Sequence, residues 1–318
     1  MKILGINALN HDASLAVVDE SGLLYWKKAG VLSGVAHDEY LNQLLVDEAM
    51  SLGPVVASYY EKPIIKKLRQ ARAGQWSEVF NLDMLPSRHL TQFGINLPVT
   101  YQWHHASHAA AGWFTSPFTS SAIVVIDAMG EWTTASIWQA QEGKPLKCLW
   151  QLRYPDSIGL FYSAFTHLIG FKPAAEEHLL QKFSDSGFNP RRYYNTVKSY
   201  IDTNGKLKYN LHKGIVDWSH PIELAQDEFD LAAAVQIVFE ETVSSLMEKA
   251  KELTNEQNLI YMGGCSLNSK FNTKLDTWWD KVWSLPNPGD SSSSIGAALL
   301  LLDKKITWTG ELSSTVRL

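Results

Sequence analysis

The stretch Ile3-Leu4-Gly5-Ile6-Asn7 opens the pattern that decides the fold. This β-rich run ends in a polar side chain and a polar turn. Two further apolar runs follow on either side of a charged turn that ends in glycine, Ser14–Val18 and Leu23–Trp26. The same order returns later in the chain, in the segments Ile123–Asp127, Thr134–Trp138 and Leu146–Trp150. Each copy is typical of three strands joined by tight turns.

Any β-meander has this order, so the echo alone does not require a duplication. Two such meanders, each followed by a helical pattern, are however the sequence mark of a duplicated ribonuclease-H-like fold. We therefore expect an α/β protein with a two-lobed, actin-like architecture and a nucleotide cleft between the lobes. Residues 1–118 are expected to form the N-terminal lobe and 119–318 the C-terminal lobe, because Ser116-Pro117 would stop a helix before the second meander.

The second half of the chain contains further regular elements. An apolar stripe at helical spacing predicts an amphipathic helix over Asp230–Leu253. Leu259–Met262 and Lys281–Leu285 are short enough and apolar enough for buried strands. Ser294–Leu302 is expected to be a helix whose N-terminus points at the preceding Pro/Gly loop.

Composition excludes several classes of protein. Hydrophobic residues make up 45% and charged residues 19% of the 318 residues, which is ordinary for a globular chain and argues against wholesale disorder. The formal net charge of -5 argues against general electrostatic binding of nucleic acid. The two cysteines, Cys148 and Cys265, form no disulfide framework and fit a reducing compartment. With neither a signal-peptide pattern nor a long apolar run, we expect a cytoplasmic protein without a membrane anchor.

Three of the ten histidines cluster in His104-His105-Ala106-Ser107-His108. Four-residue spacing puts His104 and His108 on the same side of a helix, where two imidazoles can converge on one ion. His105 would point elsewhere. A surface helix with incidental histidines is the alternative.

Two aspartates are the candidates to complete such a metal site. Asp127 ends the first strand of the second meander, where its carboxylate would face the cleft. Asp290 lies in a Pro/Gly loop before the last expected helix, and a lone aspartate there is often only a turn former or a cap. Two imidazoles with two carboxylates suit iron(II), zinc or manganese, with positions open for a phosphate or acyl oxygen.

Six segments in chain order carry a resemblance to a known family. They are Ile3–Asn7 with His11-Asp12-Ala13-Ser14, His104–Ala109, Asp127–Thr134, Gly159–Thr166 with Gly170–Pro173, Gly263–Asn268 with Asn272, and Gly289-Asp290 with Gly296–Ala298. They resemble the motifs of the NodU-type O-carbamoyltransferase family, which contains nodulation and antibiotic-tailoring enzymes and is related to the tRNA threonylcarbamoyl transferases. The resemblance runs over nearly the whole chain.

The resemblance implies roles for particular residues. The metal ligands would be His104, His108, Asp127 and Asp290, with Fe2+ the expected cation and Zn2+ or Mn2+ the alternatives. The nucleotide, as ATP or carbamoyl-adenylate, would be bound by Gly130, Glu131, Thr133, Gly263, Gly264 and Asn268. In this family a hydroxyl of the acceptor attacks the carbonyl carbon of carbamoyl-adenylate, and AMP leaves. His11 and Asp12 are the candidates for handling the acceptor's proton, although simple turn chemistry would also explain them.

The sequence departs from the family in three places. Full-length members continue into a second domain that makes the carbamoyl-adenylate, whereas this chain ends at Leu318. We therefore expect a separate adenylate-forming protein as partner, and a different donor is the alternative. Residues 29–36 are apolar or small where the family carries arginine and lysine. Residues 176–183 differ from the family's GE(Y/H)K-MGLAPYG block.

Two functional hypotheses remain open at this stage. The first is an enzyme that carbamoylates a hydroxyl of a small molecule or nucleotide, and the second is a non-catalytic subunit that keeps the metal and nucleotide sites. A sugar or acetate kinase is disfavoured, because those enzymes lack this histidine pair. The basic stretch Lys66–Arg72 is interpreted as a solvated helix face. Contact of this stretch with a nucleic-acid acceptor is the alternative.

Overall fold

The first meander forms three of the five strands of the first sheet in the described part of the chain. A computed structural model describes residues 1–215 and 225–318. Its first three strands, β1 (Ile3–Asn7), β2 (Ser14–Asp19) and β3 (Gly22–Lys28), pair antiparallel. β4 (Val56–Tyr59) then pairs parallel with β1, and β5 (Val99–Tyr101) pairs parallel with β4. Among the described residues the sheet order is β3-β2-β1-β4-β5.

The second meander begins a sheet with the same connectivity. Its antiparallel strands are β6 (Ser120–Ile126), β7 (Thr133–Gln141) and β8 (Lys147–Arg153). β9 (Asn258–Met262) pairs parallel with β6, and β10 (Lys281–Trp283) pairs parallel with β9, which gives the order β10-β9-β6-β7-β8 within the described chain. The echo in the sequence therefore corresponds to two sheets with equivalent strand order.

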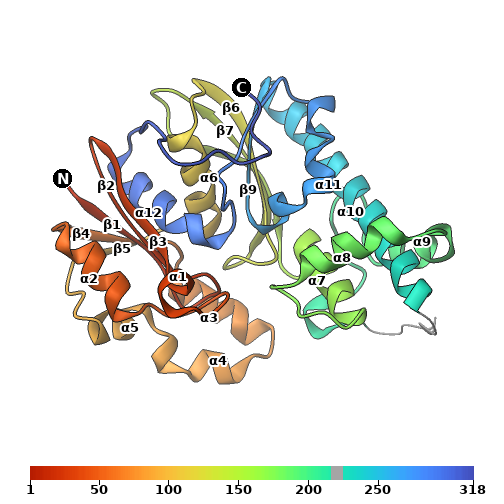
Figure 1. Cartoon of the computed structure of the whole chain (residues 1–318), viewed down its shortest axis with the longest axis horizontal. Coiled ribbons are helices and arrows are strands. Elements are labelled where there is room, and N and C mark those ends of the chain that lie inside the picture. The colour runs from red at the N-terminus through yellow and green to blue at the C-terminus, as the bar shows by residue number, and fades with distance from the viewer. Residues whose placement is uncertain (216–224) are drawn as a thin grey trace.

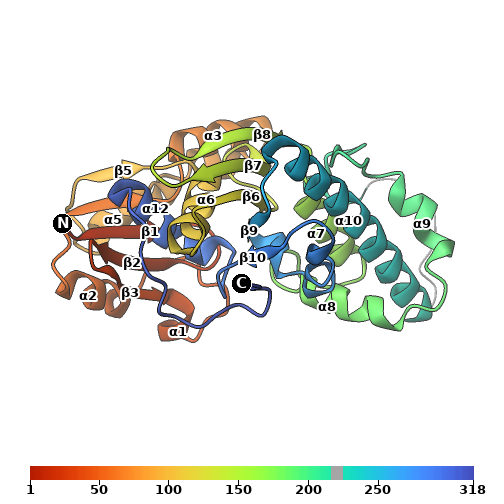
Figure 2. The same cartoon turned by 90° about the horizontal axis from the view of Figure 1, so that it is seen from above.

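Helices cover the outer faces of the two sheets (Figure 1). On the first sheet's side lie α1 (Ala29–Ser33), α2 (Gln43–Ser51), α3 (Pro63–Arg72), α4 (Trp76–Phe80) and α5 (Pro86–Gln92). On the second sheet's side lie α7 (Ile158–Leu168), α8 (Glu177–Phe183), α9 (Arg191–Lys198), α10 (Ala225–Thr254) and α11 (Ser269–Asn272). Figure 2 shows α7 to α10 grouped at the end of the molecule opposite the first sheet. None of the described helices is both long and apolar enough to span a bilayer.

Two helices are exchanged between the sheets. α6 (His104–Thr115) follows β5 of the first sheet, yet it packs on β6, β7 and β9. α12 (Ser293–Leu302) follows β10 of the second sheet, yet it packs on β1, β2 and β4. The two helices pack against each other between the sheets, as Figures 1 and 2 both show. The core between the sheets is therefore continuous through both helices.

Glycines permit the close approach at this centre. A Cβ on Gly296 of α12 would lie 1.7 Å from the backbone oxygen of Ser107 in α6. A Cβ on Gly5 of β1 would lie 1.8 Å from the backbone oxygen of Ser294 in α12. Because the obstructing atoms belong to backbones, only a residue without a side chain fits at either position.

The expected elements of the second half are present. The predicted helix Asp230–Leu253 lies within α10, and the predicted helix Ser294–Leu302 is α12 without its first residue. The predicted strand Leu259–Met262 is β9 without its first residue, whereas β10 is two residues shorter than predicted at its C-terminal end. The lobe boundary near residue 118 stays a prediction. The exchange places α12 on the sheet that residues 3–101 form.

Candidate metal centre and inter-lobe cavity

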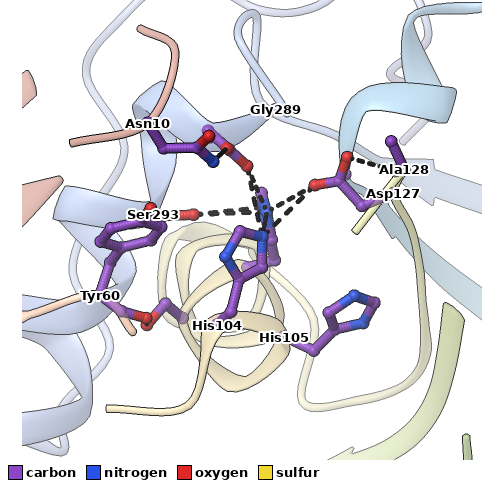
Figure 3. A network of polar contacts seen from close by, with 12 residues as sticks. Asn10, Tyr60, His104, His105, Asp127, Ala128, Gly289 and Ser293 are labelled. Carbon is purple, nitrogen blue, oxygen red and sulfur yellow. Dashed lines mark hydrogen bonds and ion pairs between the residues drawn. The ribbon is translucent and has the colours of Figure 1, made fainter. Parts of the chain in front are cut away.

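The N-terminal end of α6 carries both histidines of the predicted metal site. His104 is the first residue of the helix and His108 follows one turn later, so their side chains lie on the same face. Both are fully buried, and their Nε2 atoms are 3.1 Å apart. His105 points away from them (Figure 3), with its Nδ1 atom 2.8 Å from Ser136 Oγ.

Two buried aspartates from distant segments meet the histidines. Asp127 directly follows β6, and Asp290 begins the short helical turn Asp290–Ser292 that leads into α12. Asp127 Oδ2 lies 3.5 Å from His104 Nε2 and 3.2 Å from His108 Nε2. Asp290 Oδ1 lies 3.3 Å and 3.2 Å from the same two atoms. We call His104, His108, Asp127 and Asp290 the quartet.

The spacing of the quartet suits a transition-metal ion. Ligand bonds of about 2.1 Å place neighbouring ligand atoms of a tetrahedral site about 3.4 Å apart. The nitrogen–oxygen distances of the quartet are 3.2–3.5 Å, and all four ligand atoms lie within 4.8 Å of one another. Imidazole nitrogen and carboxylate oxygen are ligands for iron, zinc and manganese. The residues therefore fit a divalent cation.

The electrostatics of the quartet favour the same conclusion. Burial by itself lowers the pKa of the two imidazoles, but the neighbouring carboxylates outweigh it and raise the pKa of His104 and His108. Burial likewise raises the carboxyl pKa values, yet contact with the imidazoles holds the pKa of Asp127 and Asp290 below its ordinary range. Two buried carboxylates thus require two positive charges, which either two imidazolium protons or one divalent cation can supply.

Each carboxylate of the quartet also accepts a hydrogen bond from a residue outside the quartet. Asp127 directs Oδ1 outward, where it accepts a 2.7 Å hydrogen bond from the backbone N–H of Ala128. Asp290 directs Oδ2 outward, where it accepts a 2.7 Å hydrogen bond from Asn10 Nδ2. Figure 3 shows Asn10 and Ala128 to either side of His104. Such outer partners orient ligand side chains and tune affinity for a metal.

His11 and Asp12 lie in the turn after β1, next to the quartet. Asp12 Oδ2 lies 3.4 Å from His11 Nδ1 and 3.2 Å from His37 Nδ1, and Lys28 Nζ lies 3.5 Å from Asp12 Oδ1. Burial lowers the pKa of His11, but the charge of Asp290 and the hydrogen bond to Asp12 raise it to about 9. Burial raises the pKa of Asp12, but its bond to His11 and the charge of Lys28 lower it to about 2. Asp12 is therefore an ionised carboxylate that orients two imidazoles.

A cavity of about 330 Å³ opens beside the quartet. Its wall includes His11, Asp12, Asp127 and Asp290, so both the predicted proton-handling pair and the two acidic members of the quartet face it. The opposite wall comes from α7, α8, α10 and the segment 264–269. Among the described residues that line it there is no lysine or arginine. The cavity is large enough for a small-molecule ligand.

The residues predicted to bind a nucleotide separate into two groups. Gly264 and Asn268 line the cavity. Gly263, Gly130, Glu131 and Thr133 are not among the described lining residues. Gly263 has φ +91 and donates its N–H to the carbonyl of Pro288, while the N–H of Gly130 is bonded to the carbonyl of Thr133 at 2.9 Å. The carboxylate of Glu131 is bonded to backbone N–H groups of α6 and of the residue before α3.

Sequence reasoning missed several residues at this site. His37 directly follows the divergent segment 29–36, and nothing in its spacing predicts its contact with Asp12. Gln236 of α10 exchanges two 3.0 Å hydrogen bonds with Asn268, which the helical pattern of α10 did not reveal. The interpretation of Lys66–Arg72 as a solvated face is wrong for Arg69, which is 4% exposed and donates to Met129 Sδ.

Together, two equivalent α/β sheets, exchanged central helices and a buried histidine–aspartate quartet at the cavity define a two-lobed protein of the actin-like class. Component A of (R)-2-hydroxyglutaryl-CoA dehydratase from Acidaminococcus fermentans has this fold. It superposes with a TM-score of 0.51 over 94% of this chain and 97% of that chain, at 10% sequence identity. The predicted fold class is thus confirmed.

The sequence identifies the family. A family described as "Carbamoyltransferase N-terminus" matches residues 35–299, and this chain belongs to it. The uncharacterized protein sll1178 of Synechocystis is 28% identical over 93% of this chain and 56% of its own length. Nodulation protein NolNO of Sinorhizobium fredii is 24% identical over 72% of this chain and 33% of its own length. The predicted family is confirmed, and this chain spans about half or less of the length of these relatives.

Proposed function

We propose that this chain transfers a carbamoyl group from carbamoyl-adenylate to a hydroxyl of a small-molecule or nucleotide acceptor. One observation carries the proposal: in a member of the carbamoyltransferase family, a buried quartet with metal-ligand spacing borders a cavity of small-molecule size. The remaining assignments depend on where this chain's residues lie around that cavity.

The quartet would hold the divalent cation. We propose Fe2+, with Zn2+ or Mn2+ as alternatives, because the mixed imidazole and carboxylate ligands suit all three. When bound, the cation supplies Lewis-acid chemistry and neutralises charge on the donor's phosphate. Asn10 and the N–H of Ala128 keep the two carboxylates turned toward it.

The donor's nucleotide would lie along Gly264 and Asn268. A Cβ on Gly264 would lie 3.2 Å from Asp127 Oδ1, so glycine at this position leaves room next to the quartet. The side chain of Asn268 is fixed by Gln236 and caps α11 through the N–H of Phe271. We propose that Gly130, Glu131, Thr133 and Gly263 shape the backbone around the nucleotide and the cation.

His11 and Asp12 would handle the proton of the acceptor. As the hydroxyl oxygen forms its bond to the carbonyl carbon, the bond from that carbon to the phosphate oxygen breaks and AMP leaves with the electron pair. The hydroxyl proton would pass to His11 Nε2, which lies 3.6 Å from Asp290 Oδ2, while Nδ1 faces Asp12. Because the charge of Asp290 contributes to the raised pKa of His11, a divalent cation in the quartet would offset that charge and favour the neutral imidazole that can accept the proton. His11 lines the cavity, so its ring is accessible to an acceptor.

The donor would come from a separate protein that makes carbamoyl-adenylate from carbamoyl phosphate and ATP. We propose that this chain and the adenylate-forming protein act in the cytoplasm, where carbamoyl phosphate and ATP are available. A nucleic acid is disfavoured as acceptor by the net charge of -5.

A transfer assay tests the proposal. The protein is incubated with carbamoyl phosphate, ATP, an adenylate-forming protein and a panel of hydroxyl compounds, and products are examined by mass spectrometry. We expect a mass gain of one carbamoyl group that the exposed-site variant His167→Ala retains and His108→Ala abolishes. Transfer that survives His108→Ala, or no transfer to any acceptor, would overturn the proposal.

A second candidate function is a non-catalytic subunit that binds metal and nucleotide. The lack of lysine and arginine among the described cavity residues favours it, because a phosphate leaving group is normally neutralised by such cations. Binding of AMP and metal without transfer in the assay would select this second candidate.

A further inference from the structure

Glu131 lies in the loop between β6 and β7, at the base of the quartet. Its side chain is 2% exposed, although it is a carboxylate. Oε1 accepts hydrogen bonds from the backbone N–H of Lys62 at 2.8 Å and of His104 at 3.1 Å, and Oε2 lies 3.3 Å from the N–H of His104. Both oxygens are therefore directed at backbone groups, away from the cavity.

Both of these N–H groups belong to the starts of helices. Trp103, the residue before α6, provides no side-chain cap, and neither does Lys62 before α3. The first N–H groups of a helix have no partner inside the helix, and a negative charge there is favourable. One buried carboxylate thus caps α6, which carries two members of the quartet, and also fixes the start of α3.

The caps join parts of the chain that belong to different sheets. α3 follows β4 of the first sheet, whereas Glu131 lies on a loop of the second sheet. α3 also contacts this loop through Arg69, whose Nη1 donates to Met129 Sδ at 2.7 Å. The loop is therefore held between the two lobes, and the same loop begins with Asp127 of the quartet.

The backbone of the loop also lies close to the side chain of His104. A Cβ on Gly130 would lie 3.2 Å from both Cβ and Cδ2 of His104, so the backbone next to Glu131 is in close contact with that imidazole. A shift of the loop would therefore move the His104 ring and Asp127 together relative to Asp290.

We propose that Glu131 is a positioning residue, which fixes His104 and the Asp127 loop between the lobes so that the quartet has its metal-binding geometry. The inference rests on the proposed metal-binding role of the quartet. Removing the negative charge weakens the cap at the start of α6. Residues that hydrogen-bond ligand side chains contribute about 10–100-fold to metal affinity, and we expect a loss in the same range when the backbone of His104 loses this carboxylate.

Cobalt(II) titration of the metal-free protein tests the inference, because the visible spectrum of Co2+ reports coordination geometry as well as affinity. The variants are Glu131→Gln, which keeps the shape and removes the charge, Glu131→Ala, and the exposed control Glu142→Gln. We expect Glu131→Gln to bind Co2+ about 10–100-fold more weakly with altered absorption bands, at unchanged circular dichroism. The control should match the wild type.

Wild-type affinity and spectrum in both Glu131 variants would overturn the inference while leaving the proposed function intact. Loss of folding in Glu131→Gln as well as Glu131→Ala would also overturn it, because the carboxylate would then serve stability alone. A wild type that binds no Co2+ would overturn the proposed function, and the inference with it.

Discussion

The close contact between α6 and α12 gives a prediction whose size follows from the structure. In Gly296→Ala the new Cβ would lie 1.7 Å from the backbone oxygen of Ser107, and it must move to at least 3.0 Å to be tolerated. Both obstructing groups are helix backbone, so no change of side-chain conformation relieves the clash. The two helices must separate.

The separation should cost stability and metal affinity together. Overpacking of a core costs about 1–3 kcal/mol, and a clash with a backbone belongs at the upper end. With an unfolding entropy of about 2.1 cal/mol/K per residue over 318 residues, 1 kcal/mol corresponds to about 1.5 °C, so a loss of about 3 kcal/mol lowers Tm by about 4–5 °C. Ser107 precedes His108, and α12 follows Asp290 closely, so the 3.2 Å approach of these two ligands would widen beyond the tolerance of about 0.2 Å for metal sites.

Thermal unfolding and Co2+ titration measure the two effects. The matched control is Gly289→Ala, because a Cβ there would meet its nearest atom at 3.9 Å. We expect the control to unfold like the wild type and Gly296→Ala to lose both Tm and metal affinity. A Gly296→Ala protein that melts within 1 °C of the wild type would refute the described packing of the central helices.

Three further perturbations have defined outcomes. Removing the cation with a chelator should lower Tm, since a ligand present at about 1,000 times its Kd stabilises a protein by about 4.1 kcal/mol. It should also weaken binding of AMP, as measured by calorimetry. The Tm of His108→Ala should not respond to the chelator, and a chelator-sensitive variant would contradict the ligand assignment. Asn10→Ala removes the 2.7 Å bond to Asp290 and should weaken Co2+ binding about 10-fold, so an unchanged affinity would show that the carboxylate does not need this partner. Gln236→Leu leaves Asn268 Nδ2 without its partner, while Asn268 Oδ1 keeps the N–H of Phe271, and should cost about 1–3 kcal/mol in urea unfolding; a neutral result would show that water satisfies the amide nitrogen.

The fold was predictable from the sequence where its information is local. Alternation of apolar and polar residues and tight turns encode each meander, and the repetition of the meander gave the two equivalent sheets. Helix exchange was not predictable in this way. The apolar residues of α6 and α12 fit any sheet, and the choice between sheets depends on contacts such as Gly296 with Ser107, which are far apart in the sequence.

The candidate site was likewise predictable only where its geometry is local. The spacing of His104 and His108 determines their common face, because helix geometry alone brings them together. The directions of the Glu131 carboxylate and the Arg69 guanidinium depend on tertiary contacts that no spacing reveals. Because Arg69 stands among other cations, the composition of its helix predicts a solvated face. Arg69 is buried because the loop at Met129 covers its side chain.

The position of the quartet bears on how the proposed donor's phosphate would bind in a cavity whose described lining residues include no lysine or arginine. α6 begins at His104 and α12 begins at Ser293, whose Oγ lies 3.4 Å from the ring of His108, so two helix N-termini meet at the quartet. Each carries about half a positive charge, which disfavours a cation unless carboxylates compensate. Asp127 and Asp290 would balance a divalent cation. Since Glu131 already caps α6, the cation, the start of α12 and His11 in the cavity wall would be the main positive groups near an anionic donor. We therefore expect binding of a nucleotide to depend on the metal.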